Sequence, residues 1–252
     1  MRTLRAIARL LHALAVALRG WWTIRTRFEL LDDAHRAAEV ERWARRMLEV
    51  LGIRVQVQGT PPPARVPLLL ISNHISWLDI LVLHAARHVR FVSKAAVKNW
   101  PLIGLMASGA GTLYIERERR RDAMRVVHHM TEALRNGDRL AVFPEGTTSD
   151  GRVLLPFHAN LLQAAISAGV PVLPAALRFV DAATGQTSYA PRYVDEDTLL
   201  SSLWRTLCAP PLLAIVRFGE PQDSHARDRR EWAQSLHADV LALREQAQAH
   251  AN

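Results

Sequence analysis

The sequence is poor in cysteine and lysine, and it lacks a long uninterrupted apolar run. The single Cys208 excludes an intramolecular disulfide and a cysteine-based zinc cluster, which favours a reducing compartment. The apolar stretch between Arg9 and Arg19 has only nine residues, whereas a helix that spans a bilayer needs about 20. Residues 153–177 carry no charge, but prolines, a glycine and Asn160 interrupt them, so they predict a buried helix and strand.

Negative charge is also scarce. The chain has 252 residues, a net charge of +8 and 32 basic residues, of which only two are lysines. Its length suits one α/β domain with additions. The excess of positive charge predicts an anionic partner. Candidates are a nucleic acid, an acidic membrane surface and a phosphorylated substrate. The sequence has no helix-turn-helix, zinc-finger or aromatic single-strand platform, so we expect no nucleic-acid partner.

The first 51 residues predict two amphipathic helices. Residues 1–22 combine arginines with an apolar stretch that ends in Trp21 and Trp22, a pattern typical of a helix in the membrane interface. Apolar residues recur at spacings of three and four within 33–51. We therefore expect residues 1–52 to form an interfacial helix pair that binds a membrane surface. The alternative is a helix pair packed on the core with a solvated charged face.

The remainder alternates between short β-branched runs and helical patterns. This alternation predicts an α/β fold, with a mostly parallel mixed sheet flanked by helices and preceded by the amphipathic two-helix membrane-binding module. We assign residues 53–252 to the α/β domain. The runs lie at 53–58, 67–71, 89–93, 112–115, 139–143, 171–177 and 212–218, and the helical patterns at 77–87, 121–136, 158–168 and 226–247.

Polar residues follow the second apolar run abruptly. The segment reads PLLLISNHISWLDIL and places His74 five residues before Asp79. Ligands bind at strand ends in α/β sheets, and a histidine held by a carboxylate is a competent general base. The two side chains meet if His74 lies in a turn and Asp79 is the third residue of a helix capped by Ser76. In the alternative, Asp79 only caps the helix and His74 is an exposed loop residue.

Three further segments lie at expected strands, and the first two of them place polar residues at a strand end. The arginines of GTLYIERERRR (111–121) suit a phosphate, although a solvated helix start also explains them. AVFPEGTTSDG (141–151) breaks a strand into a turn, where Gly146 permits a close backbone approach. VPVLPAAL (170–177) contains two prolines and is also compatible with a plain edge strand.

NHISWLD, GTLYIER, FPEGTTS and VPVLPAAL occur in this order and resemble the four sequence blocks of the glycerolipid acyltransferase family, which includes 1-acylglycerol-3-phosphate acyltransferase. The resemblance covers about residues 65–220. It implies an O-acyltransferase that moves a fatty acyl group from acyl-CoA or acyl carrier protein to the free hydroxyl of a lysophospholipid. It also implies no metal and no cofactor, and a monotopic or peripheral location at the cytoplasmic face of the inner cell membrane.

The resemblance also assigns roles to matching residues. His74 would take the proton of the attacking hydroxyl, and Asp79 would orient His74. The implied substrate-binding residues are Asn73, Lys94, Arg117, Glu145, Gly146 and Thr147. Among them, Lys94 and Arg117 would hold the phosphate of the acceptor. The amides of the FPEGTTS turn are candidate donors to an oxyanion, which is our inference from geometry.

One departure from the family pattern concerns the acceptor. The members that form phosphatidic acid usually have EGTR in the third block, and Thr148 stands here in place of that arginine. We place 1-acylglycerol-3-phosphate first, because Arg117 and Lys94 remain. Lyso-ornithine lipid or another lysolipid is the alternative, since FPEGTTSDG also resembles bacterial relatives that acylate such acceptors. A thioester hydrolase, in which the same pair activates water, is the rival reaction.

Overall fold

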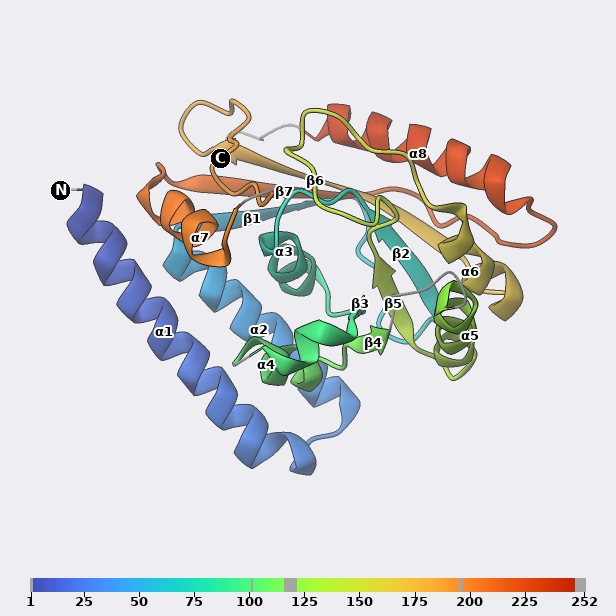
Figure 1. The fold of residues 1–252 in the computed structure, drawn as a ribbon, viewed down its shortest axis with the longest axis horizontal. Coiled ribbons are helices and arrows are strands. Elements are labelled where there is room, and N and C mark those ends of the chain that lie inside the picture. The colour runs from blue at the N-terminus through green and yellow to red at the C-terminus, as the bar shows by residue number, and fades with distance from the viewer. Residues whose placement is uncertain (1, 101, 116–121, 195–196, 248–252) are drawn as a thin grey trace.

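The computed structural model describes residues 2–100, 102–115, 122–194 and 197–247, and its centre is a seven-stranded sheet. The strand order is β1-β7-β6-β2-β5-β3-β4 (Figure 1). All neighbouring strands are parallel except β6 and β7. The expected mostly parallel mixed sheet is therefore confirmed. The strands are β1 (Ile53–Gln58), β2 (Leu68–Ser72), β3 (Arg90–Lys94), β4 (Leu113–Ile115), β5 (Arg139–Val142), β6 (Val172–Asp181) and β7 (Leu212–Phe218).

Helices cover both faces of this sheet (Figure 1). One face is covered by α1 (Arg2–Arg27), α2 (Asp33–Leu51), α3 (Leu78–Ala86), α4 (Ile103–Gly109) and α7 (Leu199–Cys208). The other face is covered by α5 (Asp122–Arg135), α6 (Leu162–Ala168) and α8 (Arg229–Gln246). Short 3-10 helices occupy Phe28–Leu30, Ala95–Asn99 and Ala159–Leu161. Every helical pattern in the sequence forms a helix, whereas α4 and α7 were not expected.

The central strand β2 shows why the sequence forms this architecture. All five of its residues are buried. Leu68 and Leu70 belong to the core cluster that includes α2 and α3, and Leu69 and Ile71 belong to the cluster that includes α5, α6 and α8. A strand with helices on both faces needs apolar residues at every position, which explains the continuous run in the sequence.

The N-terminal helices pack against the same layer as α3 and α7. Ala6 and Ala13 of α1 share a core cluster with Leu48 of α2 and with sheet residues, and Nε1 of Trp43 donates to the carbonyl of Val16 at 3.0 Å. Among the described residues, no helix is long and apolar enough to cross a membrane. Membrane binding by the helix pair, and the division at residue 52, stay predictions.

The carboxyl ends of the parallel strands gather the sequence blocks at one edge of the sheet. β2, β5, β3 and β4 run in the same direction as β6, so the segments that follow them emerge together. NHISWLD follows β2, and FPEGTTS follows β5, the neighbour of β2 in the sheet. Such an edge is where open α/β sheets bind ligands.

Candidate active site

The pair expected from the sequence is formed at this edge. Nδ1 of His74 lies 2.9 Å from Oδ2 of Asp79. The Asp79 side chain is fully buried, and the His74 side chain is 17% exposed. Since a carboxylate accepts hydrogen bonds, Nδ1 of His74 is assigned the proton and Nε2 keeps its lone pair. Nε2 forms no hydrogen bond with the described residues, so it can accept a proton from a substrate.

A local cap brings the pair together. Oδ2 of Asp79 also accepts from the backbone N–H groups of Ile75 (2.6 Å) and Ser76 (2.8 Å). Oγ of Ser76 accepts from the N–H of Leu78 at 3.2 Å. Helix α3 begins at Leu78, so Asp79 is its second residue and not its third, because Trp77 and not Ser76 directly precedes the helix. The capping and catalytic interpretations of Asp79 are thus compatible, since one oxygen fixes both the turn and the imidazole.

The imidazole is also held by stacking. The ring of Phe143, which follows β5, lies 3.8 Å from the His74 ring with an interplanar angle of 3°. Phe91 of β3 stacks in turn on Phe143 at 5.7 Å. His74 is therefore fixed by a hydrogen bond and a ring contact, and the alternative in which it is a freely exposed loop residue is wrong.

Glu145 lies against the backbone of the same turn. Its Oε1 accepts from the N–H of His74 at 2.7 Å, and its Oε2 accepts from the N–H of Leu155 at 2.9 Å. Glu145 is only 4% exposed. Burial raises the pKa of its carboxyl above the ordinary 4.5, and the two amide hydrogen bonds act against this rise. The carboxylate thus ties the FPEGTTS segment to the turn that contains His74, Ile75 and Ser76, which we call the catalytic turn.

Asn73 anchors the catalytic turn to β6. Its Nδ2 donates to the carbonyl of Leu177 at 3.0 Å, and its Oδ1 accepts from the N–H of the same residue at 2.7 Å. Asn73 is 2% exposed. Because β2 ends at Ser72, this pair of bonds continues the β2–β6 contact one residue further. The residue before His74 is therefore fixed to the sheet.

Gly146 makes the bend that follows Glu145. Its φ is +74°, a conformation that favours glycine, and its N–H donates to the carbonyl of Phe143 at 3.0 Å. A Cβ at this position would lie 2.9 Å from ring atoms of His158. The backbone conformation thus favours glycine, and a side chain here would also displace the imidazole of His158.

The chain after this bend returns to His74. The N–H of Ser149 donates to the carbonyl of His74 at 2.8 Å. Thr147 is exposed, and Thr148 is partly exposed. The amides of these two threonines form no hydrogen bond with the described residues, so they are available to a substrate oxygen.

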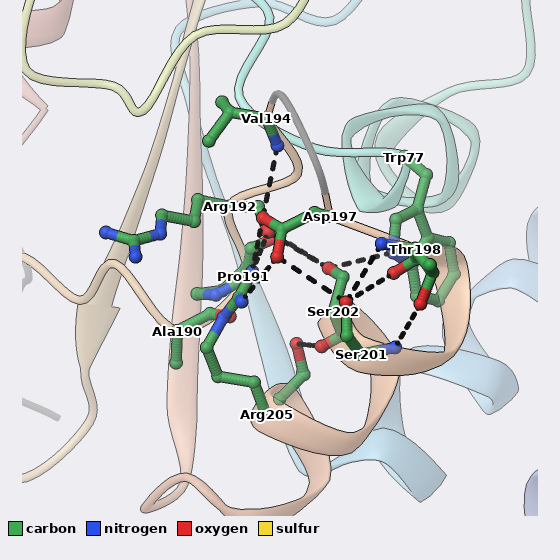
Figure 2. A network of polar contacts seen from close by, with 11 residues as sticks. Trp77, Ala190, Pro191, Arg192, Val194, Asp197, Thr198, Ser201, Ser202 and Arg205 are labelled. Atoms are coloured by element: carbon green, nitrogen blue, oxygen red, sulfur yellow. Dashed lines mark hydrogen bonds and ion pairs between the residues drawn. The ribbon is translucent and has the colours of Figure 1, made fainter.

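A second network holds the catalytic turn from the side of α7 (Figure 2). Nε1 of Trp77 donates to Oγ of Ser202 at 3.3 Å. Oγ of Ser202 in turn donates to the carbonyl of Arg192 at 3.0 Å. The N–H of the next residue, Tyr193, donates to the carbonyl of Ile75 at 3.0 Å. The segment before α7 is therefore bonded to the turn that contains His74.

Arg205 holds that segment in place (Figure 2). Its guanidinium donates to both oxygens of Asp197, at 2.8 and 3.0 Å, and to the carbonyls of Ala190 and Arg192. The hydrogen bond from Arg205 lowers the pKa of Asp197 from 3.8 to about 2. This paired charge connects α7 to the backbone that contacts the catalytic turn.

The structure unites part of the site inferred from the sequence. His74, Asp79 and Glu145 are linked directly, and Asn73 and Gly146 adjoin them. Lys94, exposed at the end of β3, and Thr147, exposed in the FPEGTTS turn, show no hydrogen bond to this set. Arg117 lies outside the described residues.

Several supporting residues were not expected from the sequence. Phe143 had a signal, because it stands at an expected strand end directly before the PEG turn. Leu155, Tyr193 and Ser202 had none, since they contact Glu145 or the catalytic turn through backbone or hydroxyl groups. The Trp77–Ser202 contact spans 125 residues, and no local pattern reveals such a partner.

Comparisons with known proteins show similarity to acyltransferases. A family model described as Acyltransferase matches residues 54–178. A lyso-ornithine lipid O-acyltransferase of Pseudomonas aeruginosa is 37% identical over 247 residues, covering 96% of this chain and 94% of the relative. A 1-acyl-sn-glycerol-3-phosphate acyltransferase of Neisseria meningitidis is 39% identical over 174 residues, covering 69% of this chain and 68% of the relative.

One solved structure has the same overall fold. The crystal structure of a 1-acyl-sn-glycerophosphate acyltransferase from Thermotoga maritima matches with a TM-score of 0.73. The match covers 100% of both chains at 22% sequence identity. At this identity the likeness supports the fold and not a particular acceptor.

Proposed function

Since the chain belongs to the glycerolipid acyltransferase family, we propose that it transfers an acyl group from a thioester to a lysolipid hydroxyl with His74 as the general base. The protein is an O-acyltransferase that acts on lysolipids. The observation that carries the proposed role of His74 is the 2.9 Å contact with buried Asp79, which leaves Nε2 as the proton acceptor.

The proposed reaction proceeds through a tetrahedral intermediate. The acceptor oxygen attacks the thioester carbonyl while Nε2 of His74 takes its proton. Asp79 stabilises the imidazolium that results, as a carboxylate does in a catalytic triad. The amides of Thr147 and Thr148 are candidate donors to the oxyanion. When the C–S bond breaks, the leaving thiolate takes the proton from His74, so the histidine returns to its neutral form.

Glu145 and Asn73 act as positioning residues in this proposal. Both carboxylate oxygens of Glu145 accept from backbone amides, and both polar atoms of Asn73 bond to Leu177. Neither side chain has a polar atom without a partner, so each supports the catalytic turn. Thr147 and Lys94 are exposed at the same edge, and we propose that they are among the residues that contact the acceptor.

We place lyso-ornithine lipid first as the acceptor and 1-acylglycerol-3-phosphate second. The sequence alone favoured the opposite order. The order changes because the Pseudomonas relative aligns along nearly the whole chain and is named for lyso-ornithine lipid. Thr148 also provides no cation for a phosphate at the position where phosphatidic acid-forming members usually have arginine. Acyl-CoA or acyl carrier protein is the proposed donor, a substrate in a reaction that we propose needs no metal and no cofactor.

The exposed face of α1 supports a membrane-bound reaction. Its large apolar residues recur every three or four positions and remain open to solvent, which is the pattern of an interfacial helix. They are Leu4, Ile7, Leu11, Leu14, Leu18, Trp21 and Trp22. We call this set the α1 stripe. Our proposal is that it lies in the cytoplasmic face of the cell membrane, where a lysolipid acceptor resides.

The test follows thiol release by purified protein in detergent. Palmitoyl-CoA serves as donor, with lyso-ornithine lipid, 1-acylglycerol-3-phosphate or no acceptor, beside His74→Ala. We expect release that requires an acceptor and falls by about 10²–10⁴ in His74→Ala, the usual contribution of a general base. Equal release without acceptor would establish a thioester hydrolase instead. If palmitoyl-CoA fails, acyl carrier protein loaded with palmitate is the second donor, and inactivity with both donors would refute the proposal.

A further inference from the structure

A cavity of about 360 Å³ adjoins the catalytic turn on the side of β6. Ile75, the residue after His74, forms part of its wall, as do Gly151 and residues 177–179 of β6. Residues 187–189, the last turn of α8, and the two neighbours of Gly151, Asp150 and Arg152, complete the lining. The volume falls within the range of small-molecule sites, which is about 300–1,000 Å³. No role for this cavity follows from the His74–Asp79 pair or from the four sequence blocks.

Three guanidinium groups line the cavity. They belong to Arg152, Arg178 and Arg244, which come from three separate segments of the chain. Arg152 pairs with Asp150, with 3.4 Å between Nε and Oδ2. Neither Arg178 nor Arg244 forms an ion pair with any described carboxylate. Two positive charges in the lining thus lack an anionic partner among the residues that the structure describes.

The neutral contacts of these two arginines leave further N–H groups available. Arg178 donates to Oγ1 of Thr187 at 2.8 and 3.2 Å and to the carbonyl of Ala247 at 3.3 Å. Arg244 donates to the carbonyls of Gly151 and Arg152 at 3.3 and 3.5 Å. A guanidinium has five N–H donors, so both groups are held in place and still have donors to spare. Held guanidinium forks are suited to carboxylates and phosphates.

We propose that this cavity binds the acidic group of the acceptor's head, with Arg178 and Arg244 as the anion-binding side chains. The inference rests on the proposed function, because it assigns the head group of the same lysolipid whose hydroxyl reacts at His74. The anion is either the carboxylate of an ornithine head or the phosphate of a glycerophosphate head. Glu245, which also lines the cavity and forms no ion pair with described residues, can accept the ornithine amine.

The experiment measures binding without turnover. Isothermal titration in detergent uses the full chain with His74→Ala, so that catalysis plays no part. The probes are N-octanoyl-ornithine, 1-octanoyl-glycerol-3-phosphate and the uncharged monooctanoylglycerol. Arg178→Gln and Arg244→Gln are each added to this background. Arg230→Gln is the matched control, because Arg230 is exposed on the same helix as Arg244 and far along it from the cavity.

We expect Arg178→Gln and Arg244→Gln to raise the Kd of an anionic probe about tenfold or more, as loss of a charged hydrogen bond does. The Kd of monooctanoylglycerol should not change in either glutamine variant. The Arg230→Gln control should leave the Kd of all three probes unchanged. The anionic probe whose Kd rises identifies the source of the acidic group. Arg178→Lys should retain part of the affinity, which separates the charge from the Thr187 contact.

Two results would overturn the proposal. One is an unchanged Kd for both anionic probes in both glutamine variants. The other is equal weakening of the uncharged probe, which would indicate a general distortion of the fold. Failure of the proposed function would appear in a different experiment, as the absence of acyl transfer by the wild-type protein. That failure would not alter the binding result.

Discussion

Oδ2 of Asp79 accepts the hydrogen bond from His74 and, at the same time, the backbone N–H groups of Ile75 and Ser76. Its other oxygen, Oδ1, is buried and has no partner among the described residues. A single carboxylate oxygen therefore sets the conformation of the turn and the tautomer of the base. The spacing of five residues between His74 and Asp79 is what allows this double role, because it spans the turn and reaches the first turn of α3.

Asp79→Asn should separate these two roles. The amide oxygen of asparagine can still accept from the turn, but it has no charge to stabilise an imidazolium. The NH₂ group of asparagine takes the position of Oδ1, which is buried and has no partner among the described residues. We expect kcat to fall by about 10²–10⁴ and the free energy of unfolding to fall by about 1–3 kcal/mol. Steady-state kinetics and urea unfolding measure the two effects. A variant with wild-type kcat would remove Asp79 from the mechanism.

Glu145→Gln tests the positioning role. Glutamine has only one acceptor oxygen, so either the His74 amide or the Leu155 amide loses its partner. We expect a loss of about 1–3 kcal/mol in the free energy of unfolding. We also expect a lower kcat with little change in the KM of the acceptor, since the side chain holds the turn. A large rise in KM at constant kcat would show instead that Glu145 contacts the acceptor.

The raised pKa of Glu145 adds a pH dependence. A carboxyl whose pKa is higher in the folded protein contributes stability below its unfolded value of 4.5, and this contribution is lost as the pH rises through the folded-state pKa. Glu145→Gln lacks the titration. The stability advantage of the wild-type protein over Glu145→Gln should therefore shrink as the pH rises from about 4 to 7. Parallel stability curves over this range would contradict the burial argument.

Much of the fold could be predicted from the sequence, because strong local patterns encode it. The seven expected runs all became strands, and the continuously apolar run of β2 reflects the helices on both faces of the sheet. Helix α2 has the expected bounds, with Asp32 as N-cap and Gly52 at its end with φ +83°. The short helices α4, with seven residues, and α7, with ten, were not expected from the sequence.

The site was predictable to the extent that its residues are close in the sequence. His74 and Asp79 are five residues apart, and their contact follows from strand, turn and helix order. The contact between His74 and Glu145 spans 71 residues, and the sheet order β2-β5 creates it. The cavity lined by Arg178 and Arg244 depends on where α8 ends, which no motif indicates.

The α1 stripe should bind vesicles in proportion to its apolar surface. Leu11→Glu combined with Leu18→Glu places two charges on a face where these residues are 63% and 51% exposed. Because the side chains face solvent, we expect no loss of fold. Binding to phosphatidylglycerol vesicles should fall about tenfold or more, since each leucine transfer contributes roughly 1.5–3 kcal/mol when complete.

Met124→Glu is the matched control for the stripe. Met124 is 80% exposed on α5, which covers the opposite face of the sheet. Cosedimentation should show wild-type vesicle binding for this variant. Acyl transfer in detergent should be similar for all three proteins, whereas transfer on vesicles should fall only in the stripe variant. Unaltered vesicle binding by the stripe variant would exclude α1 as the membrane contact.

Two histidines lie close together near the end of α3. Nδ1 of His84 lies 3.2 Å from Nδ1 of His88, and the N–H of His88 donates to Glu41 of α2 at 3.0 Å. Burial lowers the pKa of His88 to about 4, helped by the charges of Arg139 and Arg90. Burial also lowers the pKa of His84 well below 6.5, and His88 adds to this effect.

These lowered pKa values make the folded protein sensitive to acid. The unfolded chain takes up protons below pH 6.5, whereas the folded His88 does so only near pH 4, so stability is lost as the pH falls through this window. We expect His88→Asn to lose less stability than the wild-type protein between these values, as measured by urea unfolding at each pH. His225→Asn, which removes an exposed imidazole, is the control and should follow the wild-type curve. If His88→Asn also follows that curve, the buried pair does not determine the acid sensitivity, and the contact between α2 and α3 is insensitive to protonation there.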